Sequence, residues 1–340
     1  MQPSSDFSEA GSQHITAVVR IDPHLFTAFA LLNAVGYNAE NGWQYTSVRK
    51  AVRLRLAGHS DHWRSILTDA GLLETVQRSG GAMLMDIVPL LLSPPDFLLQ
   101  EGGEEHRTSW QSESRSSLGG IDCWLRRFYE DESLAQLWKE NLRAYEEAAG
   151  LLQPLGSSLE ALAQRFGEPS AGGTLEIVLM PNLLDAKGRG YSVSTAHRTW
   201  LFLGPLEDSS QAQRLVVHEL LHRWVDVAAE RAIKKGAWAD PMPAAMAQFR
   251  IVAESYPNLS IWVAETVVRA ATSWLLPSLY DTGRQSINGL MSDYEQIGFV
   301  GAETAYAHLV AERGQPLADI IQEVVDMVFQ QVLNECAPTG

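Results

Sequence analysis

Residues 218–222 read HELLH, within a segment, 211–234, whose apolar residues recur with the period of a helix. Positions four apart lie one above the other on one helix face, so the imidazoles of His218 and His222 can reach the same metal ion. Glu219 projects beside that ion, where a carboxylate can accept a proton from a coordinated water. The stretch therefore predicts a Zn²⁺ site with Glu219 as the general base.

A third protein ligand is needed, because catalytic zinc usually has three such ligands and one water. A histidine six residues after the second one is excluded, since Ala228 occupies that position. The remaining candidates are three later glutamates: Glu230, Glu254 and Glu265. Glu230 lies two turns further along the same helix and has to point away from the metal. Glu254 falls near the end of a helix expected over 243–255.

Glu265 has the most apolar neighbours of the three. It lies inside a helix expected over 260–276, and between Asn258 and Tyr280 the only charged side chains are Glu265 and Arg269. Burying an unpaired carboxylate costs several kcal/mol, and coordination of a cation removes that cost. The alternative is a surface pair of Glu265 with Arg269, worth a few tenths of a kcal/mol. The apolar neighbours favour the ligand role, so Glu265 is the predicted third ligand.

Other polar residues near the motif leave alternatives open. Asp226 lies one turn after His222 and can orient a liganding imidazole through a hydrogen bond. An ordinary exposed helix aspartate explains Asp226 equally well. The donor that would stabilise an oxyanion is also open among four residues: Tyr280, Tyr294, Tyr306 and His308.

The composition restricts the class of protein. The 340 residues are 46% hydrophobic and 20% charged, typical of a globular chain large enough for two domains. The net charge of −15 argues against nucleic acid and anionic membranes as partners. Cys123 and Cys336 form no CxxC pair, so no thiolate metal site is visible. The N-terminus lacks the apolar core of a signal peptide, and no run reaches the ~18 apolar residues of a membrane span, so a cytoplasmic location is expected.

The expected elements define an α+β, predominantly helical fold that changes character near residue 155. Residues 1–13 are expected to form a disordered tail, and 14–154 a mostly helical N-terminal domain. Residues 155–340 are expected to hold a small sheet and the helices of the metal site. The segment 101–120, rich in serine and glycine, is an exposed insertion or a lid. The expected strands are 14–21, 174–180, 191–196 and 199–204.

The HELLH of 218–222, Asp226 and the WVAE of 262–265 together resemble the gluzincins, the thermolysin-like branch of zinc metallopeptidases. The resemblance covers roughly residues 174–275. It implies a zincin-like domain with a small mixed sheet, a peptide or protein substrate, and zinc-dependent hydrolysis of peptide bonds. It further implies that the strand 199–204 is a sheet edge, along which an extended substrate pairs.

Further sequence features bear on which gluzincin branch the chain resembles and on the alternatives to a peptidase. Residues 125–129 (LRRFY) resemble a poorly characterised bacterial branch with similar zinc helices. A G-x-M-E-N signature is absent, so aminopeptidase activity is not supported. One alternative is a non-catalytic gluzincin-like scaffold, with a structural zinc, that acts as a protein-binding module. The intact Glu219 counts against it, because a structural site needs no base. Another alternative is a metal-free helix in which the two histidines are packed.

Overall fold

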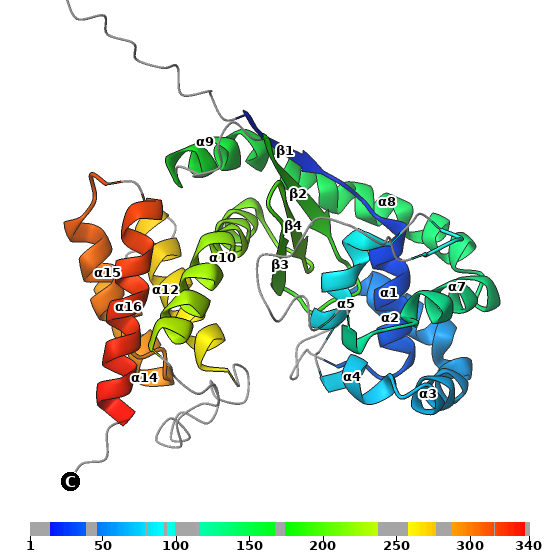
Figure 1. Cartoon of the computed structure of the whole chain (residues 1–340). Coiled ribbons are helices and arrows are strands. Elements are labelled where there is room, and N and C mark those ends of the chain that lie inside the picture. The colour runs from blue at the N-terminus through cyan, green and yellow to red at the C-terminus, as the bar shows by residue number, and fades with distance from the viewer. Residues whose placement is uncertain are drawn as a thin grey trace, which may run out of the picture.

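One mixed sheet of four strands lies at the centre of the fold, with helices on both of its faces (Figure 1). The computed structural model describes residues 14–38, 46–78, 81–91, 94–98, 114, 116–166, 174–236, 258–276, 287–315 and 317–336. The strands are β1 (His14–Val19), β2 (Thr174–Pro181), β3 (Gly190–Ser194) and β4 (Arg198–Leu203). The helices are α1 (Pro23–Ala34), α2 (Ser47–Leu56), α3 (Ser60–Asp69), α4 (Leu73–Arg78), α5 (Ala82–Ile87), α7 (Ile121–Asp131), α8 (Leu134–Leu152), α9 (Gly156–Phe166), α10 (Ser209–Gly236), α12 (Leu259–Leu275), α14 (Ile287–Ile297), α15 (Ala302–Ala311) and α16 (Leu317–Cys336). The prediction of a predominantly helical α+β fold is confirmed at this level.

The sheet joins the two halves of the chain. Its strand order is β1-β2-β4-β3, with β1, β2 and β4 parallel and β3 antiparallel to β4. β1 comes from the first half and pairs with β2 from His14↔Thr174 to Val19↔Leu179. The sheet therefore contains strands from both sides of residue 155. The domain boundary expected near that residue remains a prediction.

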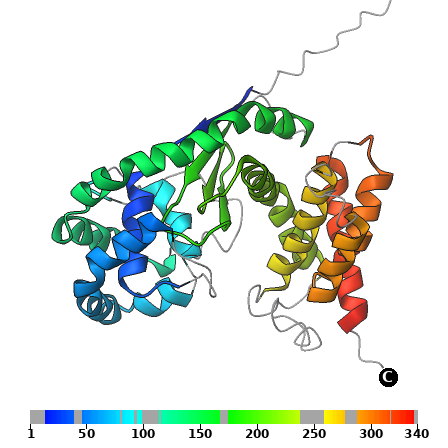
Figure 2. The same ribbon diagram turned by 180° about the vertical axis from the view of Figure 1, so that it is seen from behind.

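The two faces of the sheet bury two different hydrophobic cores. Successive residues of a strand point to opposite faces. In β2, Ile177 and Leu179 pack into the core formed with α10, α12, α15 and α16, whereas Val178 and Met180 pack into the core formed with α1, α5 and α7. Figure 2 shows these two groups of helices from behind, on either side of the sheet. Burial on both faces explains why β2 is an almost continuous apolar run.

The strand at the edge of the sheet is β3 and not β4, so the prediction that 199–204 forms an edge is wrong. After β3 the chain turns back through residues 195–197, and β4 enters between β3 and β2. The composition of the two strands fits these places. Five of the six residues of β4 (RTWLFL) are buried, as in a central strand, whereas β3 (GYSVS) is rich in serine and glycine.

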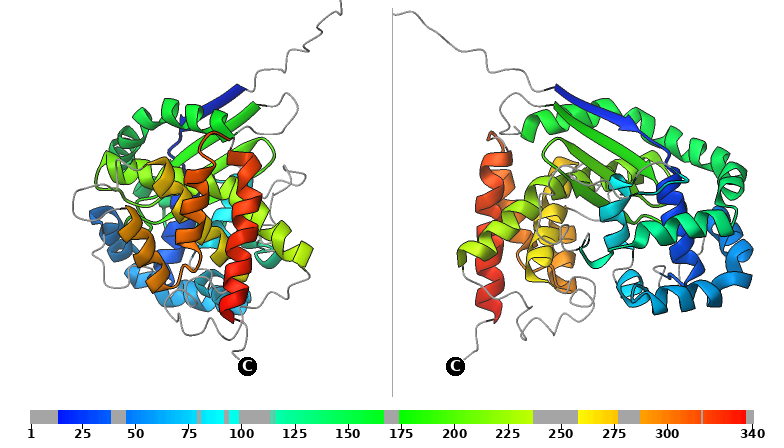
Figure 3. Two further views of the ribbon diagram at one scale, coloured as in Figure 1. Left: turned by 90° about the vertical axis from the view of Figure 1, so that its left-hand side faces the viewer. Right: turned by 45° about the vertical axis from the view of Figure 1, so that its right-hand side comes forward.

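The opposite edge of the sheet is partly covered by α9. The backbone N–H of Ala17 on β1 donates a hydrogen bond of 3.0 Å to Oε1 of Glu160 on α9. Figure 3 shows α9 running beside β1. A side chain that satisfies an edge amide blocks pairing with another strand.

Several expectations concern residues beyond the described ranges. The tail 1–13, most of the segment 101–120 and the helix 243–255 with Glu254 lie outside them. Tyr280 also lies outside. In the part of the chain that is described, no helix is long and apolar enough to cross a membrane.

A buried carboxyl group, Asp86 on α5, contacts the edge strand from the side of the N-terminal helices. Asp86 is 0% exposed, and it accepts a hydrogen bond of 2.9 Å from the hydroxyl of Tyr191 on β3. Burial raises the pKa of Asp86 to about 8, against the opposing effect of hydrogen bonds from Ser114 and Tyr191. The ordinary pKa of an aspartate is 3.8. The folded protein therefore holds a proton here over a pH range in which the unfolded chain has lost it.

This proton makes stability depend on pH. As pH rises from about 4 to about 8, the Asp86 contribution to the free energy of unfolding is expected to fall by up to about 1.4 kcal/mol per pH unit. Asp86→Asn keeps the acceptor for Tyr191 and removes the titration, so its stability should decline less over this range. Urea unfolding between pH 5 and 8 measures the difference, with the exposed Asp61→Asn as the control. Equal slopes in all three proteins would contradict the prediction.

Candidate metal centre

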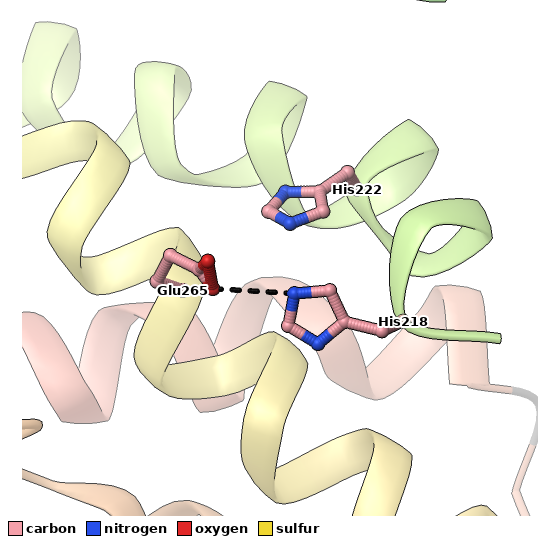
Figure 4. Close-up of side chains that lie close together, drawn as sticks. All are labelled: His218, His222 and Glu265. Atoms are coloured by element: carbon pink, nitrogen blue, oxygen red, sulfur yellow. Dashed lines mark ion pairs between the residues drawn. The ribbon is translucent and has the colours of Figure 1, made fainter. Parts of the chain in front are cut away.

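Two helices from the second half of the chain bring the predicted ligands together. α10 carries His218 and His222 one turn apart, and α12 packs along α10 with Glu265 directed at them (Figure 4). Nε2 of His218 lies 3.3 Å from Oε2 of Glu265. One ligand atom from each of the three residues lies within 4.8 Å of the other two. His218, His222 and Glu265 therefore form a group that can bind a metal ion.

The donor set fits zinc. Two atoms bound tetrahedrally at about 2.0–2.1 Å from Zn²⁺ lie about 3.3 Å apart, which is the separation of the His218 and Glu265 atoms. Oε2 of Glu265 is also buried and has no hydrogen bond among the described residues. A buried carboxylate oxygen without a hydrogen bond is costly unless a cation meets it. Two imidazoles and one carboxylate are a common ligand set of catalytic zinc.

The pair of Glu265 with Arg269, which was the alternative to the ligand role, also exists, but it is not a surface pair. Glu265 is 7% exposed, and its Oε1 lies 3.7 Å from a guanidinium nitrogen of Arg269. Burial alone raises the pKa of Glu265, but Arg269 and His218 outweigh it and hold this pKa well below its usual range. The carboxylate is therefore ionised, with one oxygen toward Arg269 and the other toward the histidines.

Asp226 orients the second histidine. Its Oδ1 lies 2.8 Å from Nδ1 of His222, and its side chain is only 17% exposed, so the reading of an ordinary exposed aspartate is wrong. Burial lowers the pKa of His222, but Asp226 and the nearby glutamates outweigh it and raise this pKa to about 10. A partner on Nδ1 leaves Nε2 as the nitrogen available to a metal.

Glu219 lies between α10 and the edge strand. It is 6% exposed, and burial raises its pKa to about 8. Glu265 and Asp226 raise this pKa further, whereas His222 and Arg189 lower it. A carboxyl group whose pKa lies near neutrality is suited to accept and return a proton.

Arg223, one turn after Glu219, was not predicted as a functional residue. It is 1% exposed and donates hydrogen bonds to the carbonyl oxygens of Thr195 (2.8 Å) and Ala196 (3.0 Å) and to the hydroxyl of Thr199 (3.0 Å). These bonds attach α10 to the turn between β3 and β4. The sequence signal for this role was weak: Arg223 is a charged residue four positions after Glu219 in a mostly apolar part of the helix.

The remaining candidates that the structure describes do not join this group. Glu230 pairs with Lys234 at 3.3 Å, and His308 lies 3.7 Å from Glu323. Tyr294 lies beside Arg269, whose guanidinium is 5.6 Å from the centre of its ring. The choice of an oxyanion donor among the predicted residues therefore stays open.

No family model, curated protein or solved structure matches this chain. The gluzincin resemblance thus depends on the motif residues themselves and on their arrangement. The arrangement consists of two histidines on one helix, a glutamate on a second helix, and a carboxyl group between the first helix and an antiparallel edge strand.

Proposed function

We propose that this protein is a zinc metallopeptidase of the gluzincin type that hydrolyses peptide bonds in peptides or proteins. The observation that supports this best is the approach of Glu265 on α12 to the two histidines of α10, with 3.3 Å between Oε2 and Nε2 of His218. Glu219 beside this group favours catalysis over the alternative of a structural zinc in a protein-binding scaffold, because a structural site needs no base.

Each residue of the centre has a role in this mechanism. His218, His222 and Glu265 would hold the metal, and Asp226 fixes the ring of His222 through Nδ1. A bound Zn²⁺ lowers the pKa of a coordinated water and polarises the carbonyl group of the substrate. Glu219 accepts a proton from the attacking water on its carboxylate and then donates it to the leaving amine.

The edge strand β3 offers the substrate a place to pair. Hydrogen-bonded and non-bonded pairs alternate along an antiparallel ladder. Arg189 and Thr195 are bonded to β4 through Gly204 N–H to Arg189 O (2.7 Å) and Thr195 N–H to Arg198 O (2.8 Å). The alternation then directs the N–H and C=O groups of the even-numbered residues of β3 away from β4. An extended peptide that pairs with Gly190 and the next such residue passes beside Glu219.

Metal content and cleavage together test this function. The purified protein is expected to contain stoichiometric zinc and to cleave members of a peptide library. A chelator should abolish cleavage, and added Zn²⁺ should restore it. A protein without bound metal would support the packed, metal-free helix. A zinc ion with four protein ligands and no water, seen by X-ray absorption, would support the structural alternative.

A further inference from the structure

Two glycines precede and begin the edge strand, and they are needed for different reasons. Gly188 has φ +67°, a left-handed conformation that favours glycine. Gly190 is the first residue of β3, and its φ is not in the left-handed region. The backbone conformation at Gly190 therefore does not itself require a glycine.

The requirement for a glycine comes instead from the space that Glu219 occupies. A Cβ atom on Gly190 would lie 2.3 Å from Oε1 of Glu219 and 2.6 Å from both its Cδ and its Cγ. Such distances are below the closest approach of non-bonded atoms, so a side chain at position 190 and the present position of Glu219 exclude each other. We propose that Gly190 is a positioning residue, whose missing side chain leaves the recess in which β3 holds the Glu219 carboxylate beside His218, His222 and Glu265.

The recess is fixed because α10 is anchored to the far end of β3. Arg223 lies one turn from Glu219, and its guanidinium binds the carbonyl oxygens of Thr195 and Ala196 at 2.8 and 3.0 Å. These bonds prevent α10 and β3 from separating without loss of buried hydrogen bonds. A side chain added at Gly190 therefore has to displace Glu219.

The near end of β3 is anchored as well. The guanidinium of Arg189, directly before Gly190, donates to the hydroxyl of Tyr37 and lies 3.9 Å from Asp185. The same Tyr37 hydroxyl donates a hydrogen bond of 2.5 Å to Asp185. With both ends held, the backbone at Gly190 has little freedom to move away from Glu219.

The catalytic consequence rests on the proposed function, whereas the packing does not. Gly190→Ala is expected to leave stoichiometric zinc in place, because the three atoms nearest to a Cβ at position 190 all belong to Glu219 and to none of the three ligands. Hydrolysis is expected to fall by about 100-fold or more, since a displaced base loses the contribution of general base catalysis.

A double-mutant cycle tests the packing without any assay of activity. Gly190→Ala is made in the wild-type protein and in a Glu219→Ala background, and the Tm of all four proteins is measured. Gly190→Ala should lower the Tm by several degrees in the wild type and by much less in the Glu219→Ala background, where the recess is empty.

Gly204→Ala is the matched control. A Cβ there would meet backbone atoms, 2.2 Å from the carbonyl oxygen of Ala186 and 2.9 Å from that of Arg189. This substitution should therefore lower the Tm equally in both backgrounds.

The outcomes separate the two proposals. An equal loss of Tm for Gly190→Ala in both backgrounds overturns the positioning role, and so does a failure to fold in both. A Gly190→Ala protein that folds only in the Glu219→Ala background supports it. Coupling in the cycle without any hydrolysis by the wild type would leave the recess established and the proposed peptidase function wrong. Hydrolysis that Gly190→Ala retains at the wild-type rate would overturn the catalytic part of the inference.

Discussion

Glu219→Gln is expected to retain stoichiometric zinc and to lose hydrolysis by about 10²–10⁴-fold. Glutamine has nearly the same shape as glutamate, so it can occupy the same recess against β3, but its amide cannot accept the proton of the attacking water. The substitution also removes a carboxyl group whose burial raises its pKa to about 8, so the folded state should lose no stability. Peptide cleavage, elemental analysis and a thermal melt of the same preparation check the three statements.

The control for this variant is Glu147→Gln, which removes a carboxylate that is 67% exposed and pairs with Arg143. It is expected to cleave peptides at the wild-type rate. Wild-type cleavage by Glu219→Gln would show that another group acts as the base. Loss of zinc from Glu219→Gln would instead make Glu219 part of the metal site.

Glu265→Ala is expected to release the metal. Removal of a partner outside the ligand shell typically weakens metal binding 10–100-fold, and the loss of one of three protein ligands should exceed that range. Hydrolysis should disappear together with zinc. Competition with a chelator of known affinity measures the change in Kd, and Glu265→Gln, which preserves volume, separates the loss of charge from the loss of packing.

Two other glutamates serve as comparisons. Glu230→Ala removes a residue of α10 that pairs with Lys234 at 3.3 Å, and it is expected to keep its zinc. Glu254, outside the described residues, is the other sequence candidate. Zinc that is retained by Glu265→Ala and lost from Glu254→Ala would show that the third ligand is Glu254.

The metal group could be predicted because its signals are local. A helix fixes the relation of His218 to His222 through its period, and the apolar neighbours of Glu265 predict the burial that is observed. The packing of α12 along α10 cannot be seen in the sequence itself. It could be inferred because a buried Glu265 carboxylate is stabilised by a cation, and the two histidines of α10 can bind one.

The arrangement around the edge strand could not be predicted in the same way. Either β3 or β4 could pair with β2, and both are short strands next to each other in the chain. Packing on both faces of the sheet places β4 beside β2 and leaves β3 at the edge. The fit of Glu219 to Gly190 joins a helix to a strand, and no periodicity links the two. The sequence gives one hint: the turn needs Gly188, which has a positive φ, but it does not explain the second glycine, Gly190.

The position of β3 between two cores makes the helical first half part of the packing around the candidate metal centre. One face of β3 borders Glu219 through Gly190, and the other presents Tyr191 to Asp86 and Val193 to the N-terminal core. Here removal of the first half would strip β1 from the sheet and uncover the face of β3 that carries Tyr191 and Val193. We therefore expect the two halves to unfold together in a single transition.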